Sequence, residues 1–218
     1  MCRYKKLLAA FVAAALLLQG CGAGDSAVAE LDGSLPLVTV DGEAVVTVQE
    51  LRNKTIEYQT ERIAAPDEKE IFKEMAQYGI LSRIAEDYGL TENRNDVAEA
   101  YDSHMKEIAD TDTYPGALEE AEALRDALSM SEEEFRTWNI AQNGISLDVE
   151  NLLDDIGDTY TQITDPTLMD ETVMEEIYAI AALYDIQISY PGLEDWDVTF
   201  DAVSTEGRMN TKETETAA

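Results

Sequence analysis

The residue best suited to covalent chemistry in this sequence is Cys21. It follows an apolar run from Leu7 to Leu18 and a Gln-Gly pair. Sulfur is the best nucleophile available near neutral pH, and its alkylation gives a stable thioether. After the cysteine the chain turns small and polar, reading GAGDSAVAELDGS. This pattern predicts that Cys21 is modified at its sulfur.

The residues before Cys21 have the parts of an export signal. Arg3, Lys5 and Lys6 give a positive start, and an apolar middle follows them. That middle of roughly a dozen residues is shorter than the stretch of about 20 that a membrane-spanning helix needs. The segment therefore predicts a signal peptide at residues 1–20.

The end of this signal, Leu18-Gln19-Gly20-Cys21, resembles the lipobox of bacterial lipoproteins. The resemblance implies cleavage between Gly20 and Cys21 and transfer of a diacylglycerol to the Cys21 thiol. Two or three acyl chains such as palmitate anchor a protein stably, whereas one chain binds membranes only marginally. We therefore expect a protein tethered to the extracytoplasmic face of the bacterial cell membrane. The alternative is a buried cysteine in an ordinary cleaved secretory peptide.

Cysteine usage and charge restrict the remaining classes of function. Cys2 would leave with the signal and Cys21 would carry lipid, so no thiol would remain for a disulfide or a thiolate metal site. The formal net charge is −31, and loss of the three basic residues of the signal would bring it to about −34. Such a surface repels nucleic acid and anionic lipid, so we expect no nucleic-acid partner. It either keeps the protein soluble or attracts basic clients or divalent cations.

Composition predicts one sizeable core, because hydrophobic residues make up 45% of the chain. We expect a flexible tether at 21–36, a disordered tail at 203–218 and a mainly helical body between them. Valine-rich runs around Asp41-Gly42 predict a tight hairpin. The alternating segment WDVTFDAV, residues 196–203, predicts a short strand able to pair with Val38–Val40.

Helix signals recur along the body. Capping boxes begin at Thr47 and Ser131, Pro66-Asp67 restarts a helix, and Thr91 is a candidate cap. Gly144 interrupts the longest apolar stripe and predicts a close crossing or a bend. Apolar residues at steps of three and four predict helices at about 48–62, 66–88, 92–110, 117–128, 132–156 and 171–184.

Three segments carry a resemblance to a known family. They read VTVDGEAVVTVQEL, FKEMAQYGILSRIAEDYGLTENRNDVAEAYD and MSEEEFRTWNIAQNGISLDVENLL. In this order they resemble the N-terminal helical module of the SurA and PrsA type of extracytoplasmic chaperone-foldase. The resemblance covers roughly residues 37–156. It implies a helical cradle for unfolded secreted proteins, with a small β hairpin.

The chain departs from that family at the isomerase. Family members often carry a parvulin prolyl isomerase domain before a last helix that returns to the module. Here only residues 157–169 would lie between the two helices, and the sole histidine, His104, leaves no histidine pair for a parvulin site. We therefore expect 157–169 to be a linker and 170–202 to be a returning helix and short strand packing on the module. We expect no enzymatic activity and no cofactor.

Other kinds of chemistry find little support. The sequence has no His-Glu-x-x-His, Gly-x-Ser-x-Gly or phosphate-loop motif. Asp110 and Asp112 are spaced as in a calcium loop, but Pro115 replaces the turn glycine and Ala121 replaces the bidentate glutamate. The sequence therefore predicts no metal site. The apolar stripe that begins with Phe135 and Trp138 is interpreted as core.

Two classes of function stay open at this point. The first is a membrane-anchored, ATP-independent holdase for unfolded exported polypeptides, without prolyl isomerase activity. The second is an interaction lipoprotein that uses the same helical scaffold to bind one specific envelope protein. An exposed apolar groove would favour the first, and a closed helical surface with one flat patch would favour the second.

Overall fold

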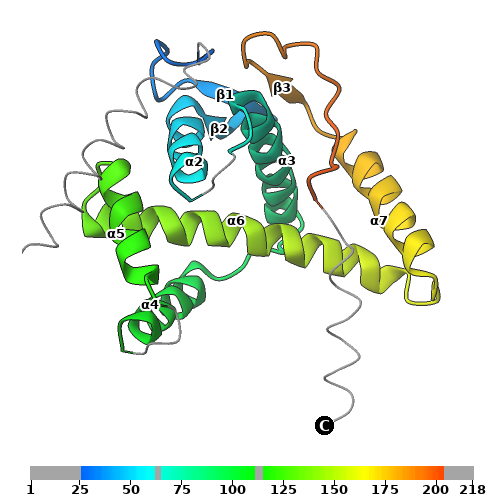
Figure 1. Cartoon of the computed structure of the whole chain (residues 1–218). Coiled ribbons are helices and arrows are strands. Elements are labelled where there is room, and N and C mark those ends of the chain that lie inside the picture. The colour runs from blue at the N-terminus through cyan, green and yellow to red at the C-terminus, as the bar shows by residue number, and fades with distance from the viewer. Residues whose placement is uncertain (1–25, 62–64, 111–114, 204–218) are drawn as a thin grey trace, which may run out of the picture. The chain divides into compact units, whose positions relative to one another are not determined.

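The computed structural model describes residues 26–61, 65–110 and 115–203. The chain divides into two compact units, Met1–Leu31 and Asp32–Ala218. The described residues form six helices and one three-stranded antiparallel sheet (Figure 1), which confirms the predicted mainly helical fold. The predicted signal, its cleavage site at Gly20 and Cys21, and the tail from residue 204 lie outside the described residues.

The predicted tether at 21–36 is described from Ser26 onward. Within the first unit, the Ala29 N–H donates to the Ser26 carbonyl and the Leu31 N–H to the Val28 carbonyl, at 3.3 and 3.1 Å. Residues 26–31 therefore form a turn. Residue 36 already begins a strand.

The sheet has the order β2-β1-β3, with β1 at Pro36–Val40, β2 at Glu43–Thr47 and β3 at Ile186–Ile188. Asp41 and Gly42 both have positive φ, 51° and 83°, as a two-residue hairpin between twisted strands requires. The predicted hairpin is therefore confirmed. Val38 and Val40 are fully buried on one face of β1.

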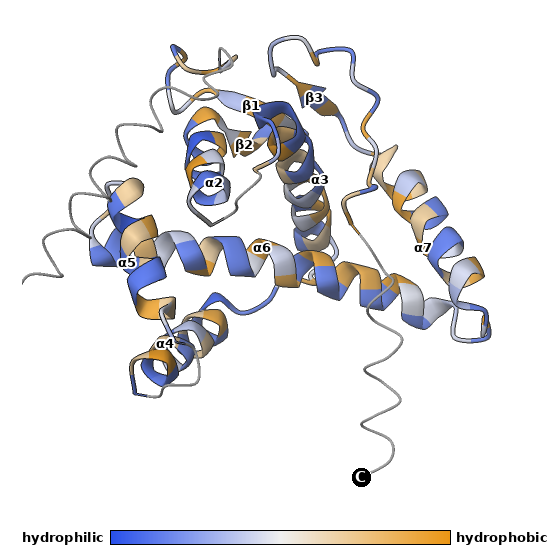
Figure 2. Ribbon diagram, in the orientation of Figure 1, coloured by the Kyte–Doolittle hydropathy of each residue, from blue (hydrophilic) through white to orange (hydrophobic). Residues whose placement is uncertain are grey.

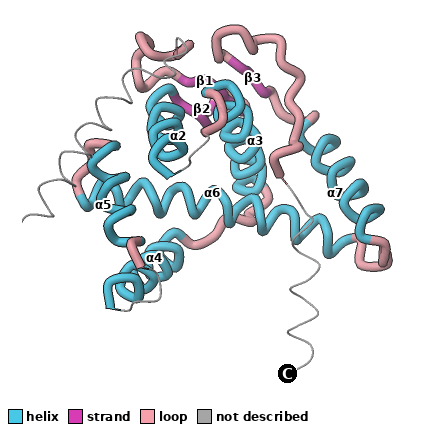
Figure 3. Tube along the Cα trace, viewed as in Figure 1, coloured by secondary structure: helices cyan, strands magenta, loops and turns pink. Residues whose placement is uncertain are grey.

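The predicted third strand at residues 196–203 is wrong. β1 pairs instead with β3, opposing Val38 to Ile188 and Val40 to Ile186. Residues 196–203 are a loop (Figure 3). Their alternation reflects contacts with aromatic residues, because Trp196 lies edge-on to Phe72 at 6.3 Å and Phe200 edge-on to Tyr178 at 5.4 Å. Burial of every second side chain on a neighbouring surface produces a strand-like pattern without a partner strand.

Both predicted capping boxes are present. The Ser131 side chain accepts from the Glu134 N–H, and Glu134 accepts from the Ser131 N–H at 2.8 Å. The Thr47 N–H donates to Glu50 at 2.7 Å, and the Glu50 N–H donates to the Thr47 hydroxyl at 3.3 Å. The helices are α2 Val48–Glu61, α3 Glu68–Asp87, α4 Arg94–Asp110, α5 Ala117–Ala127, α6 Glu132–Thr159 and α7 Pro166–Ala181.

Two predicted helix starts are displaced. Asn93, and not Thr91, caps α4, accepting from the Asn95 N–H at 3.0 Å. Asp165 caps α7 and accepts from the N–H groups of Thr167 and Leu168, so α7 begins ahead of the predicted Glu171. The connection between α6 and α7 is therefore residues 160–165, shorter than the predicted linker at 157–169.

α3 is the central helix of the second unit. It contacts α2, α6, α7 and the strands β1 and β2, and it is buried on several faces. Tyr88 is half exposed just before the positive-φ Gly89 that ends the helix. Hydrophilic and hydrophobic residues alternate along α6, which packs on α3, α4 and α7 (Figure 2). Ala141 is exposed on α6.

A buried glutamine fixes the C-terminal segment to α3. Gln77 is only 2% exposed, and its Nε2 donates to Asp201 at 2.9 Å while its Oε1 accepts from the Ala202 N–H at 2.7 Å. Both polar ends of the buried side chain are therefore satisfied. Tyr190 stacks on Phe72 at 4.4 Å and holds the same segment closer to β3.

Stability should depend on the charge of Asp201 in acid. Hydrogen bonds from Thr199 and Gln77 lower the pKa of Asp201 from its ordinary 3.8. Its stabilising contribution is complete above the unfolded value and is lost as the pH falls through the lowered folded value. We expect the difference in unfolding free energy between wild type and Asp201→Asn to shrink below pH 3.8, as measured by urea denaturation. A difference that stays constant with pH would contradict this assignment.

Candidate functional site

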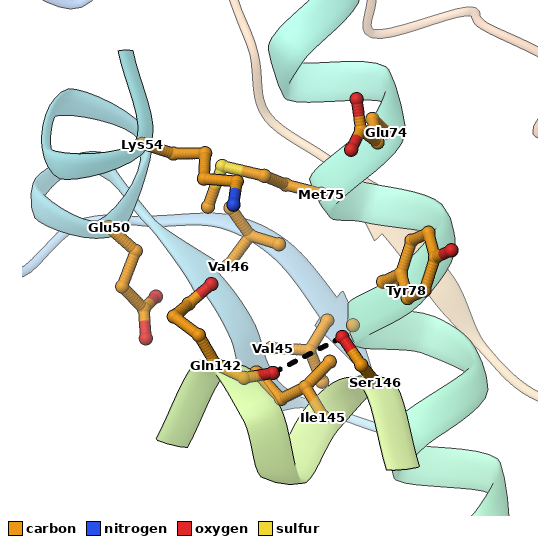
Figure 4. Close-up of a pocket in the computed structure, with 11 residues that line it drawn as sticks. Val45, Val46, Glu50, Lys54, Glu74, Met75, Tyr78, Gln142, Ile145 and Ser146 are labelled. Carbon is orange, nitrogen blue, oxygen red and sulfur yellow. Dashed lines mark hydrogen bonds between the residues drawn. The ribbon is translucent and has the colours of Figure 1, made fainter. Parts of the chain in front are cut away.

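A pocket of about 160 Å³ opens between β2, α2, α3 and α6 (Figure 4). We call it the central pocket. An engineered apolar cavity of about 150 Å³ binds benzene, so this volume suits one aromatic or branched side chain. The central pocket is lined by Val45, Val46, Glu50, Lys54, Glu74, Met75, Tyr78, Gly79, Gln142, Ile145 and Ser146.

Helical spacing explains how these side chains meet. Residues three and four apart lie on one face of a helix. α2 contributes two charged residues at that spacing, α3 contributes Met75, Tyr78 and Gly79, and α6 contributes Gln142, Ile145 and Ser146. In Figure 4 the side chains of Met75 and Lys54 converge over Val46. Three helices and one strand therefore present single faces to one opening.

Gly79 allows α3 to approach β2 closely. A Cβ atom at this position would lie 3.0 Å from the Val45 carbonyl oxygen and 3.3 Å from the Val46 side chain. A backbone carbonyl in a sheet has little freedom to move away. The glycine thus sets the depth of the pocket, because a larger residue would push helix and strand apart.

The lining of the central pocket combines apolar and polar residues, and its charged residues already have partners. Met75, Tyr78 and Ile145 are half-buried. Lys54 pairs with Glu57 at 2.8 Å, and both oxygens of Glu74 accept from the Tyr58 hydroxyl at 2.7 Å. The charges of Lys54 and Glu74 are therefore already paired within the protein. The arrangement suits binding of an apolar group.

A second hollow, of about 610 Å³, lies along β3. We call it the edge groove. One wall is Ile186–Ile188, and Trp196, Val198 and Phe200 belong to the other. The carboxylates of Asp185, Glu194 and Asp197 also line it.

An ionic junction centred on Asp148 ties α3, α4 and α6 together. Asp148 is fully buried, and its oxygens accept from Ser82 at 2.9 Å, from the Glu92 N–H at 2.8 Å and from Arg94 at 3.0 Å. A second Arg94 hydrogen bond completes a bidentate pair. Both oxygens of the carboxylate are thus occupied, so the junction is structural.

Gly144 makes this junction possible. A Cβ atom at 144 would lie 2.5 Å from the Arg94 guanidinium, which crosses α6 one turn before Asp148. The close crossing predicted at Gly144 is therefore that of a single side chain. Hydrogen bonding to Asp148 raises the pKa of Arg94.

The other sequence-predicted sites are placed as follows. His104 is exposed on α4. Asp110 ends α4, whereas Asp112 lies outside the described residues. Within the described ranges, no three His, Cys, Asp or Glu side chains are grouped to hold a metal ion. No helix in this part of the chain is long and apolar enough to cross a bilayer.

The stripe at the start of α6 is core, as predicted. Phe135 packs with Leu124 of α5 and with Leu128, which caps the end of α5, and Trp138 is partly buried against the same cluster. The rings of Phe135 and Trp138 are stacked at 5.9 Å. This cluster fills the space between α2, α5 and α6, so these aromatic residues do not form an open binding surface.

Comparison with known proteins gives no matching family model, no curated relative and no similar solved structure. The resemblance to the SurA and PrsA module therefore stays a prediction. The central pocket and the edge groove were both missed by sequence reasoning. Met75, Tyr78 and Ile145 have the spacing of core residues, and only their half-burial distinguishes them.

Proposed function

We propose that the protein is a lipid-anchored, extracytoplasmic holdase for unfolded exported polypeptides. It works without ATP and without prolyl isomerase activity. The observation that carries this proposal is the central pocket, an open hollow with a partly apolar lining on a chain with a net charge of −31. An apolar client side chain enters the pocket, and the charge keeps the loaded complex soluble.

The composition of the pocket suits many client sequences. Met75 is unbranched and polarisable, so it adapts to side chains of different shapes. Burial of one large apolar side chain contributes about 1.5 to 3 kcal/mol. A single contact of this size binds weakly, so a client is held by several contacts and released without an energy source. The resemblance to SurA and PrsA chaperones supports the same function.

Polar substitutions in the central pocket should weaken the holdase. Met75→Gln and Ile145→Gln keep most of the side-chain volume but remove the apolar wall. We expect each variant to need at least about threefold more protein than wild type for half-suppression of client aggregation, measured by light scattering.

The matched control is Ala141→Gln, an exposed position on α6 one turn before Ile145. It should protect the client as well as wild type does. Thermal unfolding followed by circular dichroism checks that all three variants remain folded. Equal protection by the pocket variants and wild type would show that the central pocket does not bind the client.

A second candidate function is binding to one folded envelope protein. It is favoured by exposed apolar residues on and just after α7, where Leu168, Tyr178 and Leu183 are 51%, 43% and 78% exposed. Affinity isolation of the lipidated protein from the cell envelope separates the two candidates. Many unfolded exported proteins favour the holdase, whereas one stoichiometric partner favours the specific interaction.

A further inference from the structure

We propose that the free edge of β3 binds an extended client segment as a fourth strand of the sheet. The segment alternates apolar and basic side chains. This inference rests on the proposed function, because the occupant is an unfolded exported polypeptide.

The register of β3 shows which backbone groups point away from β1. The Ser189 N–H donates to the Leu37 carbonyl at 2.8 Å, and the Asp41 N–H donates to the Asp185 carbonyl at 2.9 Å. In an antiparallel pair, residues bond to their partner strand alternately. Residues 185, 187 and 189 therefore face β1. The N–H and C=O groups of Ile186 and Ile188 face outward.

These outward groups open on the edge groove. Ile186 and Ile188 line it, and their outward groups bond to none of the residues that the structure describes. An unpaired strand edge is a template for another extended segment, which binds through main-chain hydrogen bonds. The groove holds about 610 Å³, enough for a short extended segment and larger than the central pocket.

The groove also has apolar surface for alternate side chains of the segment. Trp196 and Val198, which are half-buried, line the groove together with the buried Ala181 and Phe200. An added strand would direct every second side chain toward this surface. The specificity is therefore for an apolar residue at every second position.

Charge selects the remaining positions. Asp185, Glu194 and Asp197 line the groove, and no lysine or arginine does. Basic side chains at the alternate positions would meet these carboxylates and associate faster at low salt. A second copy of this chain would bring the same acidic groove to the interface. Like-charge repulsion therefore disfavours edge-to-edge pairing of two copies.

The first test uses the mature chain with its wild-type sequence and a fluorescently labelled heptapeptide of alternating valine and lysine. Fluorescence anisotropy gives its affinity. An otherwise identical peptide carries N-methyl groups along one edge, so its side chains remain but that edge cannot donate hydrogen bonds. We expect the N-methyl peptide to bind at least about tenfold more weakly. Equal affinity would overturn the proposal.

The second test places a proline on the free edge. Ile188→Pro removes an outward N–H and leaves the bonds of residues 187 and 189 to β1, and proline is tolerated at such edge positions. We expect about tenfold weaker binding of the unmethylated peptide, with Ile188→Val as the matched control that keeps the N–H.

In wild type, bound peptide should slow exchange of the Ile186 and Ile188 amide protons, measured by NMR. Unchanged exchange at these two amides would overturn the proposal.

The third test changes the charge. Asp197→Lys should weaken binding of the valine-lysine peptide several-fold at low salt, whereas Asp195→Lys, which does not line the groove, should weaken it less. Equal effects would mean that the net charge of the protein selects the peptide, and would contradict the role of the acidic residues of the groove.

A peptide-dependent dimer in sedimentation would identify a second copy as the occupant and would also overturn the proposal.

Light scattering with a full-length client separates this inference from the proposed function. If Ile188→Pro protects the client as well as wild type does, the added strand is wrong and the holdase stands. If wild type itself gives no protection, the holdase is wrong whatever the peptide measurements show.

Discussion

Replacing Asp148 with alanine is expected to lower the free energy of unfolding by about 3 kcal/mol. The carboxylate is fully buried and accepts from Ser82, the Glu92 N–H and Arg94. Removing one partner of a buried ion pair costs about 3 to 5 kcal/mol, because the other partner is left unpaired. The low end applies because the Arg94 side chain is 45% exposed and can regain water. Urea denaturation of the two proteins measures the loss.

An exposed ion pair in the same molecule provides the control. Arg136 binds Asp102 through two hydrogen bonds of 2.7 and 2.8 Å, a bidentate geometry like that of Arg94 and Asp148. The two side chains are 42% and 53% exposed, and water screens such pairs. Asp102→Ala should therefore cost clearly less than Asp148→Ala. Equal losses would show that burial of Asp148 contributes little to stability.

Replacing Cys21 with serine is expected to release the protein from the membrane completely. Cys2 would leave with the signal, so Cys21 would be the acylation point of the mature chain. A serine hydroxyl is a much weaker nucleophile than a thiol near neutral pH. Metabolic labelling with a fatty-acid analogue, followed by membrane fractionation, measures the change.

The matched control for this experiment is Cys2→Ser. It should keep both the label and the membrane fraction, because it changes a cysteine within the predicted signal. Label retained by Cys21→Ser would contradict the lipobox interpretation. Loss of label in both variants would show that export itself had failed.

Features governed by near neighbours in sequence were predictable. The capping boxes at Thr47 and Ser131 and the hairpin at Asp41-Gly42 each depend on two to four consecutive residues. The position of β3 could not be predicted in this way, because Ile186 and Val40 are far apart in sequence. Two segments of the sequence could have paired with the same edge of β1. Alternation favoured residues 196–203. Aromatic contacts in the folded chain account for that alternation.

The sites depended on packing that the sequence does not display. Met75 and Ile145 have the spacing of core residues, and they line a pocket because α2, β2 and α6 leave space beside α3. Asp148 did leave a signal, since it is an acidic residue within the apolar stripe that includes Val149 and Leu152. Its partner Arg94, the first residue of α4, had no comparable signal. Only one of the two partners of this ion pair, Asp148, could therefore be identified from the sequence.

The central claim, that the protein holds unfolded exported polypeptides, is tested most directly by light scattering of a refolding secreted protein. The mature chain is added without ATP, at low and at high salt. The account predicts suppression of aggregation at both, stronger at low salt for basic clients, because screening beyond a Debye length of about 8 Å at physiological salt weakens the electrostatic part. No suppression at several-fold molar excess, for several different clients, would contradict it.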